Sequence, residues 1–323
     1  MTHELNARGP AAGSPKTATR EAYGKALVEL GRARPDVVVL DADLSKSTMT
    51  ARFAREFPDR FYNVGIAEQN LMGTAAGLAL GGLTPFASTF AVFAAGRAYD
   101  QVRQSIAYPG LNVKICATHA GITVGADGAT HQAIEDIALM RVLPNMTVIV
   151  PADDVETEQA VKTAASHEGP VYIRLGRHPV PRVTPEGYEF EVGKATVLRQ
   201  GDDVALVACG IGVSIALSAA EMLAARGIRA AVLNVSTIKP LDARTIVSAA
   251  ERCGRVVTIE EHSTIGGLGG AVCELLSERR PVAVRRVGVP DVFGQSGPPD
   301  ELLRFYGLTP ENVVSAVEEM EGR

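Results

Sequence analysis

Residues 112–153 read NVKICATHAGITVGADGATHQAIEDIALMRVLPNMTVIVPAD and give the clearest indication of how the chain folds. The stretch begins and ends with the apolar runs NVKICA and MTVIVPAD, and between them QAIEDIALMRVL repeats its apolar residues every three to four positions. Short apolar strands that alternate with helices are typical of a parallel sheet covered on both faces. We therefore predict an α/β fold, doubly wound.

The same alternation continues in both directions along the chain. Toward the N-terminus, VVVLDAD follows a helical pattern and precedes a predicted helix that begins near Ile66. Between residues 174 and 195 the pattern loosens into Pro, Gly and charged residues, and it then restarts at VALVACGIG. We predict two three-layer α/β domains with parallel or mixed sheets. The expected ranges are a flexible N-terminal segment at 1–16, a first domain at 17–180, a linker at 181–191 and a second domain at 192–323.

Composition limits the partners that the chain is expected to have. Of the 323 residues 46% are apolar, and the net charge of −5 provides no positive field for nucleic acid or an anionic membrane. Residues 71–96 contain no charge, but their glycines and Pro85 argue against a membrane helix. The four cysteines have no CxxC spacing and read as core residues of a cytoplasmic protein. We expect small-molecule partners, no nucleic acid and no membrane.

Two loops contain acids whose role the residues alone leave open. DADLSKST (41–48) follows an apolar strand, and Asp43 with its serines could simply cap a helix. Glu68 lies in NVGIAEQNLMG (63–73) among small and apolar residues, where capping or a buried ion pair is the usual fate of an acid. Catalytic groups of open α/β sheets gather at the carboxyl ends of strands, so both acids are also candidates for a site.

A third loop, THAGITVGADGATHQ (118–132), favours chemistry more strongly. It combines His119, Asp127 and His131 with three glycines directly after a predicted strand. A single histidine would usually be structural, whereas two on one glycine-rich loop point to a site. Their spacing does not suit two ligands on one helix face, and no cysteine or acid cluster completes a zinc shell. We predict no metal ligands in this chain.

Several motifs together resemble the carboxyl-terminal half of transketolase, a thiamine diphosphate enzyme. They are VGIAEQNLMGTAAGLALGG, STFAVF, the glycine-rich loop with the helix and strand after it, STIKPLD, EEHSTIGGLGG and FGQSG, in this order. The likeness runs from about Thr19 to the end of the chain. It implies a pyrimidine-binding domain at 17–180, followed by the family's third domain at 192–323.

The resemblance also implies a partner chain. Full-length relatives carry an amino-terminal diphosphate-binding domain whose GDG motif and downstream Asn hold Mg²⁺, and this chain has neither in the right setting. The chain thus resembles the second subunit of a split transketolase, an α2β2 heterotetramer in which the partner supplies the magnesium ligands. Such an enzyme transfers a two-carbon ketol unit from a ketose phosphate to an aldose.

Residue roles follow from the matched motifs. In the family, the acid at position 68 faces N1′ of the cofactor's aminopyrimidine, and a dry, apolar setting favours the protonated form of such an acid. The resemblance implies that Glu68, His119 and His131 are catalytic, that Asp43, Ile66, Phe90 and Phe93 contact the cofactor, and that Arg20, Ser47, His119, Asp127 and Arg174 bind the sugar phosphate.

Departures from the family pattern keep other readings open. Ala126 replaces an acid, the usual serine–arginine pair near position 174 is Ile173 and Arg174, and Arg177 is a rival for the phosphate. Alternatives are the synthase that joins pyruvate to glyceraldehyde 3-phosphate, the β-subunit of a 2-oxo acid dehydrogenase, and a silent assembly or regulatory half-enzyme. His119 argues against the synthase, and the retained reacting positions argue against a silent copy. The acids and histidine of EEH (260–262) are expected to be structural or interfacial.

Overall fold

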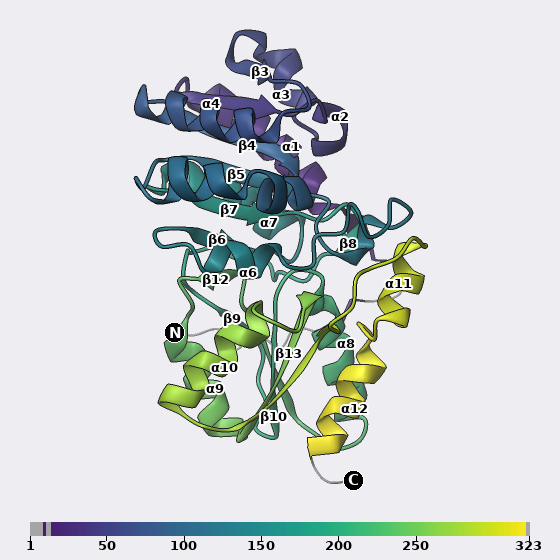
Figure 1. Ribbon diagram of the computed structural model, residues 1–323. Coiled ribbons are helices and arrows are strands. Elements are labelled where there is room, and N and C mark those ends of the chain that lie inside the picture. The colour runs from purple at the N-terminus through teal and green to yellow at the C-terminus, as the bar shows by residue number, and fades with distance from the viewer. Residues whose placement is uncertain (1–8, 11–13, 321–323) are drawn as a thin grey trace.

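A computed structural model describes residues 9–10 and 14–320, which form two large sheets that are each covered by helices (Figure 1) and one two-stranded sheet. This arrangement confirms the predicted α/β class with mixed sheets. Most of the expected N-terminal segment at 1–16 lies outside the described residues. The part that is described ends in strand β1 (Lys16–Thr17), which pairs antiparallel with β8 (Val180–Pro181).

The larger sheet has seven strands in the order β12-β6-β7-β5-β4-β2-β3, and every pair except β12 with β6 is parallel. Its central strands are buried on both faces, as their continuous apolar sequences predict. The strands are β2 (Val37–Asp41), β3 (Phe61–Asn63), β4 (Thr84–Phe90), β5 (Lys114–Thr118), β6 (Thr147–Ile149), β7 (Val171–Arg174) and β12 (Thr237–Lys239).

Helices cover both faces of this sheet and create two separate apolar cores. One face packs against α1 (Thr19–Ala33) and α7 (Asp154–Ser166). The other face packs against α4 (Glu68–Leu80), α6 (Asp136–Arg141) and two π-helical turns. Those turns are η2 (Phe93–Arg97) and η3 (Val102–Ala107), and the remaining short elements are α2 (Ser45–Thr48), α3 (Ala51–Glu56), η1 (Pro58–Arg60), α5 (Tyr99–Gln101) and η4 (Ile122–Val124).

The smaller sheet has five strands in the order β14-β13-β10-β11-β9, with β9 antiparallel to its neighbour. Helices α8 and α12 pack together on one face, and α9 and α10 cover the other (Figure 1). The elements are β9 (Thr196–Arg199), β10 (Val204–Ala208), α8 (Gly212–Ala224), β11 (Ala230–Asn234), α9 (Ala243–Cys253), β13 (Arg255–Ser263), α10 (Leu268–Arg279), β14 (Ala283–Val289), α11 (Pro299–Phe305) and α12 (Pro310–Met320).

The two halves of the chain share structure across the expected linker. Strand β12 follows residue 192 in sequence but joins the first sheet through Thr237 and Lys239, which pair with β6. One apolar cluster also contains residues from both halves, including Leu71 of α4 and Val272 of α10. The expected ranges of the domains stay predictions, and residues 237–239 belong to the sheet of the first half.

The uncharged stretch at 71–96 forms most of α4, a turn and strand β4, as its glycines predict. Within residues 9–10 and 14–320, no helix combines the length and apolar character needed to span a bilayer. The stretch instead supplies the apolar face of α4 and a central strand. Parallel strands β2, β4 and β5 end at the same edge of the sheet, so the loops that follow them come together there.

Candidate active site

Glu68 is the first residue of α4 and only 2% exposed, although it carries a carboxylate. Its position at a helix N-terminus suits a negative charge, since the helix dipole is positive there. Arg97, the last residue of η2, places Nη1 at 3.0 Å from Oε2 and 3.1 Å from Oε1 of Glu68. Glu68, the acid that the sequence places among apolar residues, is therefore both buried and ion-paired.

Two aromatic rings stand beside this pair. Phe90 ends β4 and Phe93 begins η2, and their rings stack with centroids 5.8 Å apart and planes inclined by 10°. Arg97 lies over the ring of Phe93, with Cζ 4.3 Å from the centroid. We call these two stacked rings the Phe90–Phe93 wall. A flat ligand ring could stack on this wall and contact the Glu68 carboxylate beside it.

His119 follows β5 in a left-handed conformation (φ 57°) and stacks on Phe90 at 3.8 Å between ring centroids. Arg20 Nη1 lies 3.3 Å from His119 Nε2, and Thr118 Oγ1 lies 2.8 Å from Nδ1. A guanidinium only donates, so Nε2 accepts and Nδ1–H donates to Thr118. Burial first, then the charges of Arg20 and Arg177, lower the pKa of His119 to about 3. The imidazole is neutral at physiological pH.

His131 approaches the same aromatic rings from another direction. Its ring meets Phe93 edge-on at 5.5 Å between centroids, and its Nδ1 lies 2.9 Å from Thr130 Oγ1. The two histidines, which are twelve residues apart in sequence, therefore both contact the Phe90–Phe93 wall. The glycine-rich loop makes this possible because its ends are joined by a bridge between Ala120 and Ala133.

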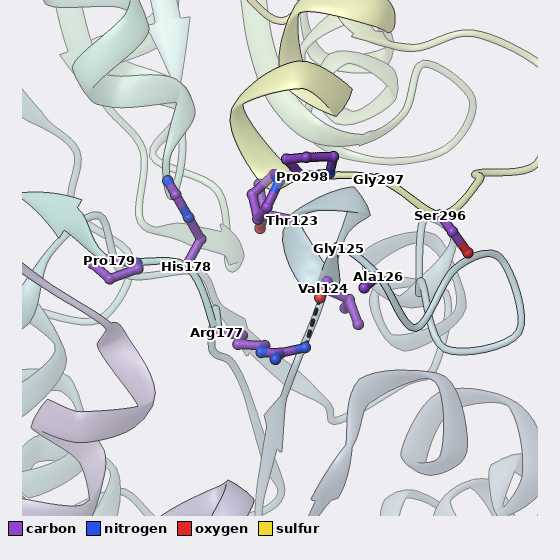
Figure 2. Close-up of a pocket in the computed structure, with 11 residues that line it drawn as sticks. Thr123, Val124, Gly125, Ala126, Arg177, His178, Pro179, Ser296, Gly297 and Pro298 are labelled. Atoms are coloured by element: carbon purple, nitrogen blue, oxygen red, sulfur yellow. Dashed lines mark hydrogen bonds between the residues drawn. The ribbon is translucent and has the colours of Figure 1, made fainter.

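Asp127 and Arg177 form a half-exposed ion pair at 3.2 Å beside this site. Arg177 also donates to the carbonyl oxygen of Val124 at 2.8 Å, and Figure 2 shows this bond at the rim of a pocket of about 560 Å³. Ala126, which stands where the family has an acid, lines the same pocket. The pocket extends from the glycine-rich loop to Ser296 and its neighbours in the second half of the chain.

The loop after β2 is organised by an acid that sequence reasoning did not single out. Asp41 is buried and accepts hydrogen bonds from Leu44 N at 2.6 Å and Thr48 Oγ1 at 2.7 Å. Asp43 is exposed and pairs with Asn63 instead of capping α2. The backbone oxygen of Ser47 accepts from Arg20 Nη1 at 2.9 Å, which brings this loop next to His119.

Two predicted residues lie apart from this cluster. Ile66 is 78% exposed, close to Glu68 along the chain but outside the aromatic wall. Arg174 is buried, and its Nε lies 2.9 Å from Oδ2 of Asp136 while its Nη2 donates to the carbonyl oxygens of Ala133 and Glu261. These bonds do not favour Arg174 as a phosphate ligand, and both assignments stay predictions.

The EEH segment lies behind the glycine-rich loop. Glu261 is buried, and its Oε1 accepts a hydrogen bond of 2.7 Å from the backbone nitrogen of Thr123. Gly121 has a φ of 78°, and a Cβ there would lie 2.3 Å from the Glu261 carboxylate. Glu260 accepts from Leu268 N and Gly269 N at the start of α10. These acids tie the second half of the chain to the loop that carries both histidines.

The donor groups fit an aminopyrimidine better than a metal ion. A buried carboxylate and a stacked aromatic pair are what a planar, protonatable ring requires. Among residues 9–10 and 14–320, no group of three or more His, Cys, Asp or Glu side chains is arranged to hold a metal ion. Besides Asp41, the sequence did not indicate Arg97, whose only signal was a cation at the end of an otherwise uncharged run.

Comparison with known proteins identifies the two halves of the chain. Residues 15–182 match the family model of the transketolase pyrimidine-binding domain, and residues 193–313 match that of the transketolase C-terminal domain. One solved structure is described as "Split gene transketolase, inactive beta4 tetramer". It is 60% identical to this chain with a TM-score of 0.87, and the match covers 94% of this chain and 98% of the chain in that structure.

Two relatives are named as subunits of sugar-specific transketolases. A 6-deoxy-6-sulfo-D-fructose transketolase subunit from Clostridium sp. (strain MSTE9) is 46% identical over 94% of this chain and 94% of its own length. A subunit of an apulose-4-phosphate transketolase from Phocaeicola vulgatus is 41% identical over 92% of this chain and 95% of its own length. With family models covering both halves and relatives matching over nearly their whole length, the chain belongs to the transketolase family, whose members depend on thiamine diphosphate.

Proposed function

We propose that this chain is the pyrimidine-binding subunit of a two-chain transketolase that transfers a two-carbon ketol unit from a ketose to an aldose. The observation that carries this proposal is the convergence of Glu68, Phe90, Phe93, His119 and His131 at one edge of the sheet. Relatives that match this chain over nearly their whole length and are named as transketolase subunits support it.

Thiamine diphosphate would lie with its pyrimidine ring between Glu68 and the Phe90–Phe93 wall. When bound, the cofactor supplies the nucleophilic carbon and the electron sink of the reaction. Glu68 would exchange a proton with N1′ of the ring, and its burial keeps water from competing for that proton. Phe90 and Phe93 would fix the plane of the ring.

The two histidines would act on the sugar. His131 is half-buried at the edge of the wall and would hold or move a proton at the sugar's carbonyl oxygen. His119 is neutral and its pKa of about 3 keeps it so, and its Nε2 would accept a hydrogen bond from a sugar hydroxyl in place of the one from Arg20. Asp127, on the same loop, would accept a hydrogen bond from another hydroxyl.

An anionic end of the sugar would be bound by arginines. Arg20 and Arg177 lie close enough for each charge to lower the pKa of His119, and the charge of Arg177 also adds to the burial that lowers the pKa of Arg20. An anion between them would relieve this repulsion. We propose Arg177 for the role that the sequence resemblance gave to Arg174. The substrates named for two relatives, a sulfonated and a phosphorylated sugar, both carry an anionic group.

A partner chain would supply the remaining half of the site. The family's magnesium and diphosphate ligands belong to a domain that neither family model finds in this chain. We propose an α2β2 assembly with a diphosphate-binding subunit that holds Mg²⁺. One similar solved structure is described as an inactive tetramer of β chains. Its inactivity supports the need for a second kind of chain.

Reconstitution tests this function. We expect the isolated chain to be inactive, and the chain mixed with its diphosphate-binding partner, thiamine diphosphate and Mg²⁺ to cleave ketose phosphates. Glu68→Gln in the complex should lower kcat by at least about 100-fold, because the proton shared with the cofactor is lost. Glu56→Gln, the same change at a glutamate that pairs with Arg32 on the surface, is the matched control. Activity of the isolated chain, or full activity of the Glu68→Gln complex, would contradict the proposal.

A further inference from the structure

Arg97 lies where it contacts both surfaces that the cofactor ring would need. Its Nη1 binds both carboxylate oxygens of Glu68, at 3.0 and 3.1 Å, and its guanidinium lies over the ring of Phe93 with Cζ 4.3 Å from the centroid. Phe93 and Arg97 are the first and last residues of the same π-helical turn, so the backbone brings the two side chains together.

The exposure of the two charged groups shows from which side Arg97 approaches. Glu68 is 2% exposed, whereas the side chain of Arg97 is 51% exposed. Arg97 therefore covers the carboxylate from the solvent side, which is the side open to an incoming molecule. A long, half-exposed arginine can turn into solvent without any movement of the backbone.

A guanidinium and an aminopyrimidine have the same recognition chemistry. Both are planar and stack on an aromatic face, and an aminopyrimidine protonated at N1′ donates an N–H to a carboxylate as a guanidinium does. Since Glu68 presents one carboxylate and Arg97 covers the ring of Phe93, a guanidinium and an aminopyrimidine would compete for the same contacts. A competitor that is part of the chain reduces the apparent affinity for the ligand by the fraction of time it occupies the subsite.

We propose that Arg97 occupies the pyrimidine subsite as a stand-in for the cofactor ring, and that cofactor binding requires Arg97 to release Glu68. This inference rests on the proposed function, because it assigns the subsite to thiamine diphosphate. The pair keeps a buried carboxylate compensated until the ligand replaces the arginine, and an uncompensated carboxylate at this site would be costly. Arg97 is thus a residue that tunes cofactor affinity and not a catalytic residue.

Calorimetric titration of the two-chain complex with thiamine diphosphate and Mg²⁺ tests this proposal. We expect Arg97→Ala to lower the dissociation constant of the cofactor roughly fivefold, since a half-exposed ion pair no longer has to be broken. Arg97→Gln removes the charge more conservatively and should change the constant in the same direction. Arg103→Ala removes another exposed arginine of the neighbouring turn η3 and should leave the constant within about twofold of the unmodified complex.

A double-mutant cycle makes the result specific to the Glu68–Arg97 pair. In a Glu68→Gln background the ion pair is already lost, so Arg97→Ala should change the dissociation constant by less than about twofold. Weaker or unchanged cofactor binding by Arg97→Ala, or an equal gain in both backgrounds, overturns the proposal. If the unmodified complex binds no thiamine diphosphate at all, the proposed function fails instead, so the two outcomes are distinguishable.

Discussion

At the scale of single residues, His119 illustrates how its surroundings in the folded chain set the charge of a histidine. His119 is 2% exposed, stacks on Phe90 and faces two arginines, whereas His131 is half-buried at the edge of the same wall. The sequence predicted that both histidines belong to the site. It could not predict that His119 is neutral, because the burial that lowers its pKa, and the charges of Arg20 and Arg177 that lower it further, depend on the folded structure.

The lowered pKa of His119 predicts a pH effect on stability. In the folded chain the pKa is about 3, so between pH 6.5 and 3 the unfolded chain binds a proton that the folded chain does not. Stability should fall as pH decreases through this range, and His119 should account for about 2 kcal/mol of the loss between pH 7.5 and 5. Urea unfolding of the unmodified chain and of His119→Asn at both pH values measures it. An identical pH dependence of the two proteins would contradict the assignment.

Glu68 shows what a local pattern can and cannot reveal about one residue. An acid in an apolar run predicts burial with a partner, and the structure contains both features. The partner, Arg97, lies 29 residues further along and depends on a π-helical turn that no sequence pattern predicted. Long-range pairing of this kind is decided by tertiary packing, which periodicity does not describe.

At the scale of elements, the loop after β2 depends on which of two aspartates points inward. Strand side chains alternate between faces, so Asp41 and Asp43 point the same way until the chain leaves the strand. Asp43 has left it and adopts a φ of 64°, while Asp41 stays in β2 and binds Leu44 N, Thr48 Oγ1 and Thr50 Oγ1. The sequence predicted the loop as part of the site but named Asp43 and Ser47 and not Asp41.

A matched pair of substitutions tests this division of roles. Asp41→Asn turns one acceptor oxygen into a donor that faces other hydroxyls, and it should lower the free energy of unfolding by about 1–3 kcal/mol. Asp43 is exposed, so Asp43→Asn should change the free energy of unfolding by less than about 0.5 kcal/mol. Guanidinium unfolding of both variants measures the difference. Equal effects of the two substitutions would show that Asp41 does not organise the loop.

The helix predicted from QAIEDIALMRVL shows tertiary structure overriding a local preference. The structure shortens it to α6 (Asp136–Arg141), because residues just before it have other backbone partners. Ala133 accepts from Gly121 N, and Ile134 accepts from Ser263 N. A continuous helix would have given up the bonds that close the glycine-rich loop and connect it to the second half of the chain. The strands, by contrast, were well predicted, since their apolar runs need no distant partner to be recognised.

At the scale of the whole molecule, the two halves of the chain are joined at the back of the candidate site. Arg174 of β7 pairs with Asp136 and donates to the backbone oxygen of Glu261, and Glu261 accepts from Thr123 in the glycine-rich loop. Sequence patterns predicted two domains and a linker but did not predict these contacts between the two halves. Contacts between segments 38 to 138 residues apart carry no signature in a single sequence.

Arg174 and Arg177, the two candidates for binding the phosphate, can be distinguished by matched substitutions. Arg174→Met removes one partner of a buried ion pair and should lower the free energy of unfolding by about 3–5 kcal/mol. Arg177→Met removes a half-exposed partner of Asp127 and should cost less than about 1 kcal/mol. In the two-chain enzyme, Arg177→Met should raise KM for a phosphorylated ketose at least about tenfold while leaving KM for the unphosphorylated sugar nearly unchanged, because a guanidinium recognises the phosphate alone. Thermal or urea unfolding together with KM values for the paired sugars measures both effects. A selective rise of KM in Arg174→Met with none in Arg177→Met would return the phosphate to the buried arginine and contradict the anchoring role that joins the two halves.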